Sequence, residues 1–175
     1  MRTFRPPERL TSARRAVSVV LLPLVAGPIL ASTAAAPPGA RIVIGGATAL
    51  MMVVMGFILA LSWLGPSRMT YTVGVGKLRI ETLFSKQEWP LASLHARRYS
   101  PSGIWRVGGT ALPGYFTGRY RADGEGIRMF ATDTSHGVLI IGKDRLFVTP
   151  SDEAAFLEAL RTGGAQVDEA HARPI

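Results

Sequence analysis

The chain has 175 residues, 47% of them hydrophobic, with 20 Lys and Arg against 12 Asp and Glu. Because it contains no cysteine, it forms no disulfide, offers no thiolate for catalysis or metal binding, and carries no lipoprotein anchor. The formal charge of +8 does not indicate nucleic-acid binding, because from Gly65 onward 14 basic side chains face 11 acidic ones, a net +3.

Two long stretches lack charge. No charged residue occurs between Arg15 and Arg41, or between Arg41 and Arg68. Each stretch exceeds the ~20 apolar residues that cross a bilayer as a helix, and the segment between them is rich in helix breakers. We therefore predict a transmembrane hairpin, made of a basic arm at residues 1–15, a first helix at 16–36, a short external loop at 37–41 and a second helix at 42–64.

The distribution of basic residues predicts the orientation of this hairpin. Five arginines precede the first stretch and Arg68, Lys77 and Arg79 follow the second, whereas the connecting loop offers only Arg41. Cytoplasmic flanks of membrane helices carry the excess of Lys and Arg. We expect a multi-pass protein of the bacterial inner membrane with both termini in the cytoplasm, and a basic arm able to lie on anionic lipid headgroups.

The first stretch also fits a secretory signal peptide, because small residues at positions 34–36 follow its apolar run. Pro37 comes next, and proline directly after the cut is poorly accepted. We therefore expect the segment to be retained. After cleavage, the second stretch would still leave everything beyond Arg68 in the cytoplasm.

The two predicted membrane helices contain no ionisable side chain, so they offer no proton relay or ion site. Small residues four apart allow helices to approach closely. The candidates for such packing, within the hairpin or against another protein, are Gly45, Ala49, Gly56 and Ala60.

Beyond Arg68 apolar and polar residues alternate, as is typical of β-strands. Two strands are predicted to form a hairpin around Gly76, and turns are predicted at Asp123-Gly124 and at residues 142–144. Further strands are predicted at residues 86–94, 115–121, 126–132, 137–141 and 145–149. Short strands at this close spacing predict a small antiparallel barrel or sandwich.

One helix is predicted near the C-terminus. Thr149 is a candidate cap, Pro150 suits the first helical position, and Asp152 favours the helix N-terminus. An apolar stripe follows and two glycines end the helix; the stripe consists of Phe156, Leu157 and Leu160. The domain is therefore predicted at residues 69–162, with a flexible tail at 163–175.

Several short motifs occur together in this part of the chain. They are Tyr71-Thr72-Val73, Leu78-Arg79-Ile80, Trp89-Pro90-Leu91, the segment from Leu112 to Tyr120, the segment from Gly126 to Thr132, and the segment from Thr149 to Phe156. In this combination the chain from Thr70 to Leu160 resembles the bacterial pleckstrin-homology-like domains that follow one or two transmembrane helices. The resemblance implies a strongly bent antiparallel barrel of about seven strands, capped by one C-terminal helix, with no catalytic residues.

The sequence shows no catalytic or metal-binding constellation. His95, His136 and His171 lack the spacing of a metal site. The serines stand in no nucleophile-elbow sequence, and no glycine-rich segment precedes a phosphate-binding Lys. We expect no metal, no cofactor and no enzymatic activity, and a membrane-bound enzyme ranks third among the functions considered.

Basic residues are the candidates for binding. Lys77 and Arg79 share one face of a predicted strand and resemble the basic pair of eukaryotic phosphoinositide-binding domains, although exposed charges of this kind also simply keep a strand face in water. Arg119 and Arg121 share the strand face opposite Phe116. The candidate interaction patch comprises Lys77, Arg79, Arg97, Arg98, Arg106, Arg119 and Arg121.

We therefore expect a non-enzymatic inner-membrane protein whose cytoplasmic domain is an adaptor or regulator. Its expected partner is a membrane or cytoplasmic protein, with anionic lipid as a second possibility and nucleic acid excluded. The alternative is a structural subunit of a larger membrane complex, assembled through the transmembrane hairpin.

Overall fold

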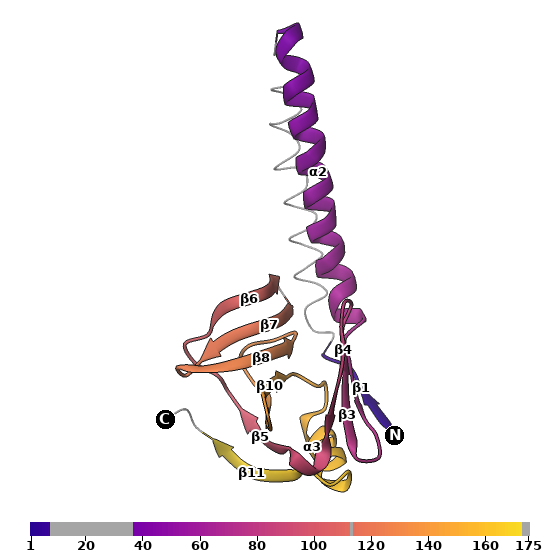
Figure 1. Ribbon diagram of the computed structural model, residues 1–175, viewed down its shortest axis with the longest axis vertical. Coiled ribbons are helices and arrows are strands. Elements are labelled where there is room, and N and C mark those ends of the chain that lie inside the picture. The colour runs from indigo at the N-terminus through magenta and orange to yellow at the C-terminus, as the bar shows by residue number, and fades with distance from the viewer. Residues whose placement is uncertain (8–36, 113, 173–175) are drawn as a thin grey trace. The chain divides into compact units, whose positions relative to one another are not determined.

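The computed structural model describes residues 1–7, 37–112 and 114–172 (Figure 1). The chain divides into two compact units, one formed by residues 1–8 and 64–175 and the other by residues 9–63. The first unit is a mainly-β domain, and the second contains most of a long helix.

That helix, α2, runs from Pro38 to Ser67. Its residues 42–67 have a mean hydropathy of 2.4, so α2 is long and apolar enough to cross a membrane. The loop predicted at residues 37–41 is wrong beyond Pro37, because the helix already begins at Pro38. Proline suits the first turn of a helix. The other predicted helix, at residues 16–36, lies outside the described residues. The described part of the chain thus contains one such helix and not a hairpin of two.

A four-stranded sheet begins the domain, in the order β1-β2-β3-β4. Its strands are Arg2–Phe4, Thr70–Val73, Lys77–Glu81 and Lys86–Pro90. The predicted hairpin around Gly76 is confirmed, with that glycine at a φ of 69°. The strand predicted at 86–94 ends at Pro90, which donates no ladder hydrogen bond, and a 3₁₀ turn at Leu91–Ser93 follows.

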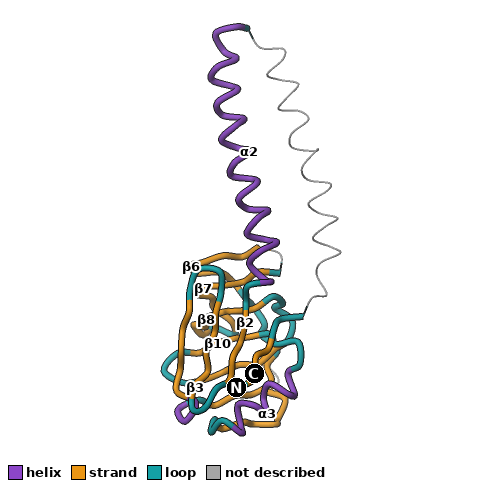
Figure 2. Tube along the Cα trace, turned by 90° about the vertical axis from the view of Figure 1, so that its right-hand side faces the viewer, coloured by secondary structure: helices purple, strands orange, loops and turns teal. Residues whose placement is uncertain are grey.

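A seven-stranded sheet completes the domain, in the order β11-β5-β9-β10-β8-β7-β6. Its strands are β5 His95–Tyr99, β6 Trp105–Leu112, β7 Tyr115–Ala122, β8 Glu125–Ala131, β9 Gly137–Ile141, β10 Arg145–Val148 and β11 Gln166–Ala172. β10 pairs antiparallel with β9 but parallel with β8. Figure 2 shows that strands make up most of the domain, with α3 (Glu153–Thr162) at one end.

Two apolar clusters lie on opposite faces of this sheet. Along β8, Phe130 belongs to the cluster that also contains the four-stranded sheet and α3, whereas Met129 belongs to a smaller cluster with β7. β10 alternates in the same way, with Val148 in the first cluster and Phe147 in the second. Since successive side chains of a strand point to opposite faces, the centre of the sheet is buried on both sides.

The described residues contain eleven strands in two sheets, more than the barrel of about seven that the resemblance implied. β5 and β6 were not predicted, because one is rich in polar residues and the other in glycine. The tail predicted to be flexible contains β11, which pairs in parallel with β5. The N-terminal arm contains β1, which pairs with β2. Each added strand satisfies backbone groups of a sheet edge.

Helix α3 confirms the predicted C-terminal helix with a change of cap. Asp152 is the N-cap, and its Oδ1 accepts a hydrogen bond from the Ala155 N–H at 2.9 Å. Thr149 instead accepts a hydrogen bond from the Thr132 N–H. The predicted apolar stripe is buried, with Phe156 and Leu160 fully enclosed.

Replacing a buried residue of this stripe should destabilise the domain. We expect Phe156→Ala and Leu160→Ala each to lower the free energy of unfolding by about 2–5 kcal/mol, the usual cost of a large-to-small change in a core. Arg161→Ala is the control, since Arg161 is exposed and its ion pair with Glu158 lies at the surface. Chemical denaturation of the three variants provides the measurement, and equal effects would contradict this packing of α3.

Two glycines bring β6 and β7 unusually close. Gly109 has a φ of 109° and Gly118, its register partner, a φ of 123°. A Cβ on Gly109 would collide with the Thr117 carbonyl oxygen, and one on Gly118 with that of Gly108. Both positions therefore require glycine for conformation and for space.

The neighbouring glycines 108 and 109 provide a matched pair of substitutions. Gly109→Ala should destabilise the domain by about 1–3 kcal/mol or more, because it combines backbone strain with a steric clash. Gly108→Ala should have a much smaller effect, because a Cβ there meets no atom within 4 Å and its φ is not positive. Thermal unfolding compares them, and the reverse order would refute the close approach.

Candidate interaction surface

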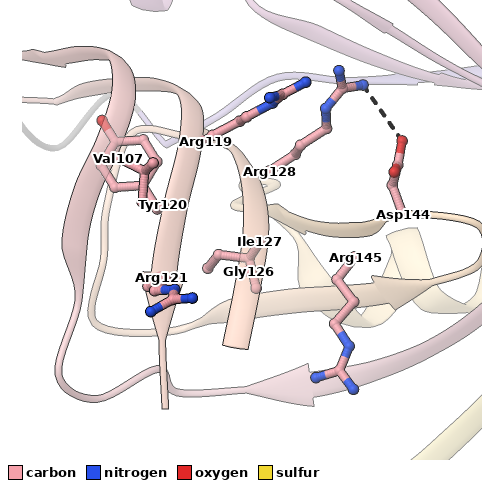
Figure 3. Close-up of a pocket in the computed structure, with 9 residues that line it drawn as sticks. All are labelled: Val107, Arg119, Tyr120, Arg121, Gly126, Ile127, Arg128, Asp144 and Arg145. Carbon is pink, nitrogen blue, oxygen red and sulfur yellow. Dashed lines mark hydrogen bonds and ion pairs between the residues drawn. The ribbon is translucent and has the colours of Figure 1, made fainter. Parts of the chain in front are cut away.

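A hollow of about 320 Å³ opens at the end of the seven-stranded sheet where β8 and β10 begin side by side and β7 finishes. Four arginines line it, two from β7 and one each from β8 and β10: Arg119, Arg121, Arg128 and Arg145. We call it the arginine hollow. Val107 of β6 and Asp144 also line it (Figure 3).

The strand register places two of these arginines opposite each other. Arg119 on β7 is the register partner of Arg128 on β8, and their side chains extend in the same direction (Figure 3). Arg128 has polar neighbours, since its Nη1 lies 3.5 Å from Asp144 Oδ2 and 3.1 Å from Gln87 Oε1. Like charges directly opposite across two strands destabilise their pairing. The hollow therefore favours a negatively charged occupant.

The other arginines of the hollow differ in their surroundings. Arg145 forms an ion pair with Glu125 at the start of β8 and extends away from Arg119 (Figure 3). Arg121 is exposed, and its register partner on β6 is Trp105. Four guanidinium groups thus face two carboxylates around one opening, which leaves a positive potential.

Among the residues that the structure describes, β6 is the last strand of the seven-stranded sheet, so it forms an open edge beside the hollow. Trp105 is 69% exposed and Val107 66% exposed on it. A bulge between Arg106 and Gly108 interrupts the pairing with β7 at Val107. The edge presents unpaired backbone groups together with exposed apolar side chains, a combination that suits addition of an extended segment.

The turn between β7 and β8 lies at the same end of the sheet and is held in place by polar contacts. Asp123 adopts a φ of 51°, and its carboxylate accepts hydrogen bonds from the hydroxyls of Ser102 and Tyr99. These hydroxyls lower the pKa of Asp123. Burial and the nearby carboxylate raise the pKa of Tyr99 to about 12. The carboxylate therefore stays charged and the phenol stays protonated at neutral pH, so the turn is preorganised.

The structure separates the seven basic residues proposed from the sequence. Only Arg119 and Arg121 line the arginine hollow. Arg106 lies on the adjacent strand, with its Nη1 3.4 Å from the Gly109 carbonyl oxygen. Lys77 and Arg79 lie on β3, where each has an acidic neighbour: Lys77 Nζ is 3.6 Å from Glu88 Oε2, and Arg79 pairs with Glu81. The Arg79 side chain lowers the pKa of that glutamate.

Arg97 and Arg98 point to different faces of β5. The Arg97 guanidinium lies 5.9 Å from the centroid of the Tyr99 ring, a cation–π arrangement. Its buried Nε has no hydrogen-bond partner among the described residues. Arg98 lines a second hollow with α3 and β11. Neither residue contributes to the arginine hollow.

The sequence did not identify Arg128 or Arg145 as candidates. Arg128 lies within the strand predicted at residues 126–132, but its approach to Arg119 follows from the register of β7 and β8. Arg145 and Asp144 reach the hollow because β10 pairs in parallel with β8, and no local pattern indicates that pairing.

The predicted helix-packing residues all lie on α2: Gly45, Ala49, Gly56 and Ala60. A Cβ added at Gly45 or Gly56 would meet no atom of the described residues within 4 Å. Among the residues that the structure describes, no three His, Asp or Glu side chains are grouped to hold a metal ion.

A four-stranded sheet, a seven-stranded sheet and a C-terminal helix thus form a mainly-β domain. The model of the family described as Bacterial PH domain matches residues 69–163, more than half of the chain. The chain belongs to this family, and the resemblance drawn from its motifs is confirmed. PH domains are generally non-enzymatic binding modules. No curated protein and no solved structure matches the chain.

Proposed function

We propose that this chain is a membrane-anchored, non-enzymatic adaptor whose PH domain lies in the cytoplasm and binds an acidic segment of a partner protein. Membership of the PH family supports a binding role, and the apolar helix α2 supports a membrane anchor. The arginine hollow is the proposed binding site.

The observation that carries this proposal is the pairing of Arg119 with Arg128 across β7 and β8. Two guanidinium groups on opposed strand positions repel each other, and Asp144 neutralises only one of them. A carboxylate that enters between them relieves this repulsion and accepts bidentate hydrogen bonds. The site is therefore complementary to an acidic side chain.

The edge of β6 favours a protein over a lipid headgroup as the occupant. An extended segment that pairs with β6 gains main-chain hydrogen bonds, covers Trp105 and Val107, and brings its own side chains beside the hollow. A headgroup would use only the charges. In addition, Tyr115 packs against Gly65 at the end of α2. Arg119 lies four residues further along β7, about 13 Å from Tyr115.

The binding proposal is tested by removing the two unneutralised arginines. The full-length tagged protein is purified in mild detergent as wild type, as Arg119→Ser/Arg121→Ser, and as the control Arg98→Ser/Arg161→Ser, which removes two arginines from the second hollow. We expect a partner to co-purify with the wild type and the control and to be lost from the first variant. Its retention should also weaken as salt rises, because salt screens exposed charges.

Three other results would contradict the proposal. Equal recovery of the partner with both variants would exclude the arginine hollow as its site. If the Arg119→Ser/Arg121→Ser variant lost bound anionic phospholipid instead of a protein, the ligand of the hollow would be a lipid headgroup. Loss of the partner only on Gly45→Leu/Gly56→Leu would favour the structural-subunit alternative, in which α2 forms the contact.

Topology is tested separately with reporter fusions. The arginines that flank the two uncharged stretches predict that fusions after Arg15 and after Ile175 report the cytoplasm, whereas one inserted at Pro37 reports the outside. Enzymatic reporters active on only one side of the membrane provide the readout. A C-terminus on the outside would contradict the placement of the domain.

A further inference from the structure

The N-terminal segment is bound to the domain as an additional strand. β1 pairs antiparallel with β2, with the register Arg2 to Val73, Thr3 to Thr72 and Phe4 to Tyr71. The two strands are separated by more than 60 residues that include α2. The family match begins only at residue 69, so the segment is an addition to the domain that the family model describes.

Apolar side chains of the segment make the contacts with the core. The Phe4 ring meets the Phe156 ring edge-on, at 5.2 Å between centroids and 84° between planes, and packs against the main cluster. Pro6 is buried. By contrast, Arg2 and Arg5 are exposed. Although the segment is basic, its apolar residues are the ones that face the domain.

Backbone and hydroxyl groups complete the contact. The Ser151 N–H, just before α3, donates a hydrogen bond of 2.8 Å to the Arg5 carbonyl oxygen. The hydroxyl oxygens of Thr3 and Thr72 lie 3.4 Å apart. The segment therefore occupies a groove bounded on one side by the edge of β2 and on the other by the start of α3.

We propose that this groove is a binding site for an extended Phe-x-Pro segment, and that its occupant is residues 2–6 of the same chain. The apolar ring and the proline provide recognition, and pairing with β2 provides the backbone hydrogen bonds. This arrangement holds the N-terminus on the side of the membrane that carries the domain. Pro7 and Leu64 therefore lie on the same side of the membrane.

The topological part of this inference rests on the proposed membrane anchoring by α2, whereas docking in the groove does not depend on the arginine hollow. The two proposals can therefore fail separately.

The absence of cysteine from the chain permits a direct test. Thr3→Cys/Thr72→Cys places two thiols at register partners, within reach of a disulfide. The full-length protein is oxidised mildly in native membranes, denatured, and labelled with a maleimide-linked polymer that marks free thiols on a gel. We expect an intramolecular disulfide. Thr3→Cys/Thr110→Cys is the control, because Thr110 lies on β6 in the other sheet.

A second comparison tests recognition by Phe4. Adding Phe4→Ala to the Thr3/Thr72 cysteine pair should slow disulfide formation about tenfold, because the docked state loses the burial of an aromatic ring. Adding Arg2→Ala should leave the rate unchanged, since Arg2 is exposed. Equal rates for the two additions would overturn the role of the ring.

The remaining outcomes overturn the docking itself. A disulfide-linked dimer would mean that the N-terminus of a second copy occupies the groove. No disulfide, with both thiols free to react with maleimide, would mean that the groove is empty or that the two residues lie on opposite sides of the membrane. Equal disulfide formation in the Thr3/Thr110 control would show random collision instead of docking.

Discussion

The parallel pairing of β8 with β10 is the constraint on which the rest of the domain depends. β10 lies between β9 and β8, and the apolar side chains of β8 and β10 alternate between the two clusters, with Phe130 and Val148 in one and Met129 and Phe147 in the other. Strands buried on both faces gain apolar burial on each side, at roughly 25 cal/mol per Å². The same pairing aligns the starts of β8 and β10, which creates the arginine hollow. The proposed binding surface and the core therefore both depend on this pairing.

Local chemistry explains which elements the sequence predicted. Alternation identified β3, β7 and β8, and the acid at Asp152 with the stripe at Phe156 identified α3. The missed strands lack such patterns. β5 is polar, with a partly buried Arg97 that stacks on Tyr99, and β6 contains adjacent glycines that pack backbone against backbone. β1 and β11 are strands because of what they pair with, and those partners lie far away in the sequence.

Some residues of the candidate site were likewise predicted from the sequence, and others were not. Arg119 and Arg121 were placed on one strand face by alternation, and the structure keeps them together at the hollow. Arg128 and Arg145 could not be added from the sequence, because strand register and parallel pairing bring them there. Lys77 and Arg79 were proposed from the sequence, but each forms an ion pair with an acidic residue of its own sheet. Whether a basic residue is a candidate for binding can therefore be judged only when the charges around it are known.

The separation between β1 and β2 also determines the order in which the chain assembles during synthesis. The ribosome makes Phe4 and Pro6 first, but β2 follows more than 60 residues later, roughly 3–13 s at about 5–20 residues per second. During that interval α2 is also synthesised. Phe156, the ring that meets Phe4, emerges later still. β1 is thus made before α2 but is among the last strands to reach its place, and the sheet closes only after α2 has left the ribosome.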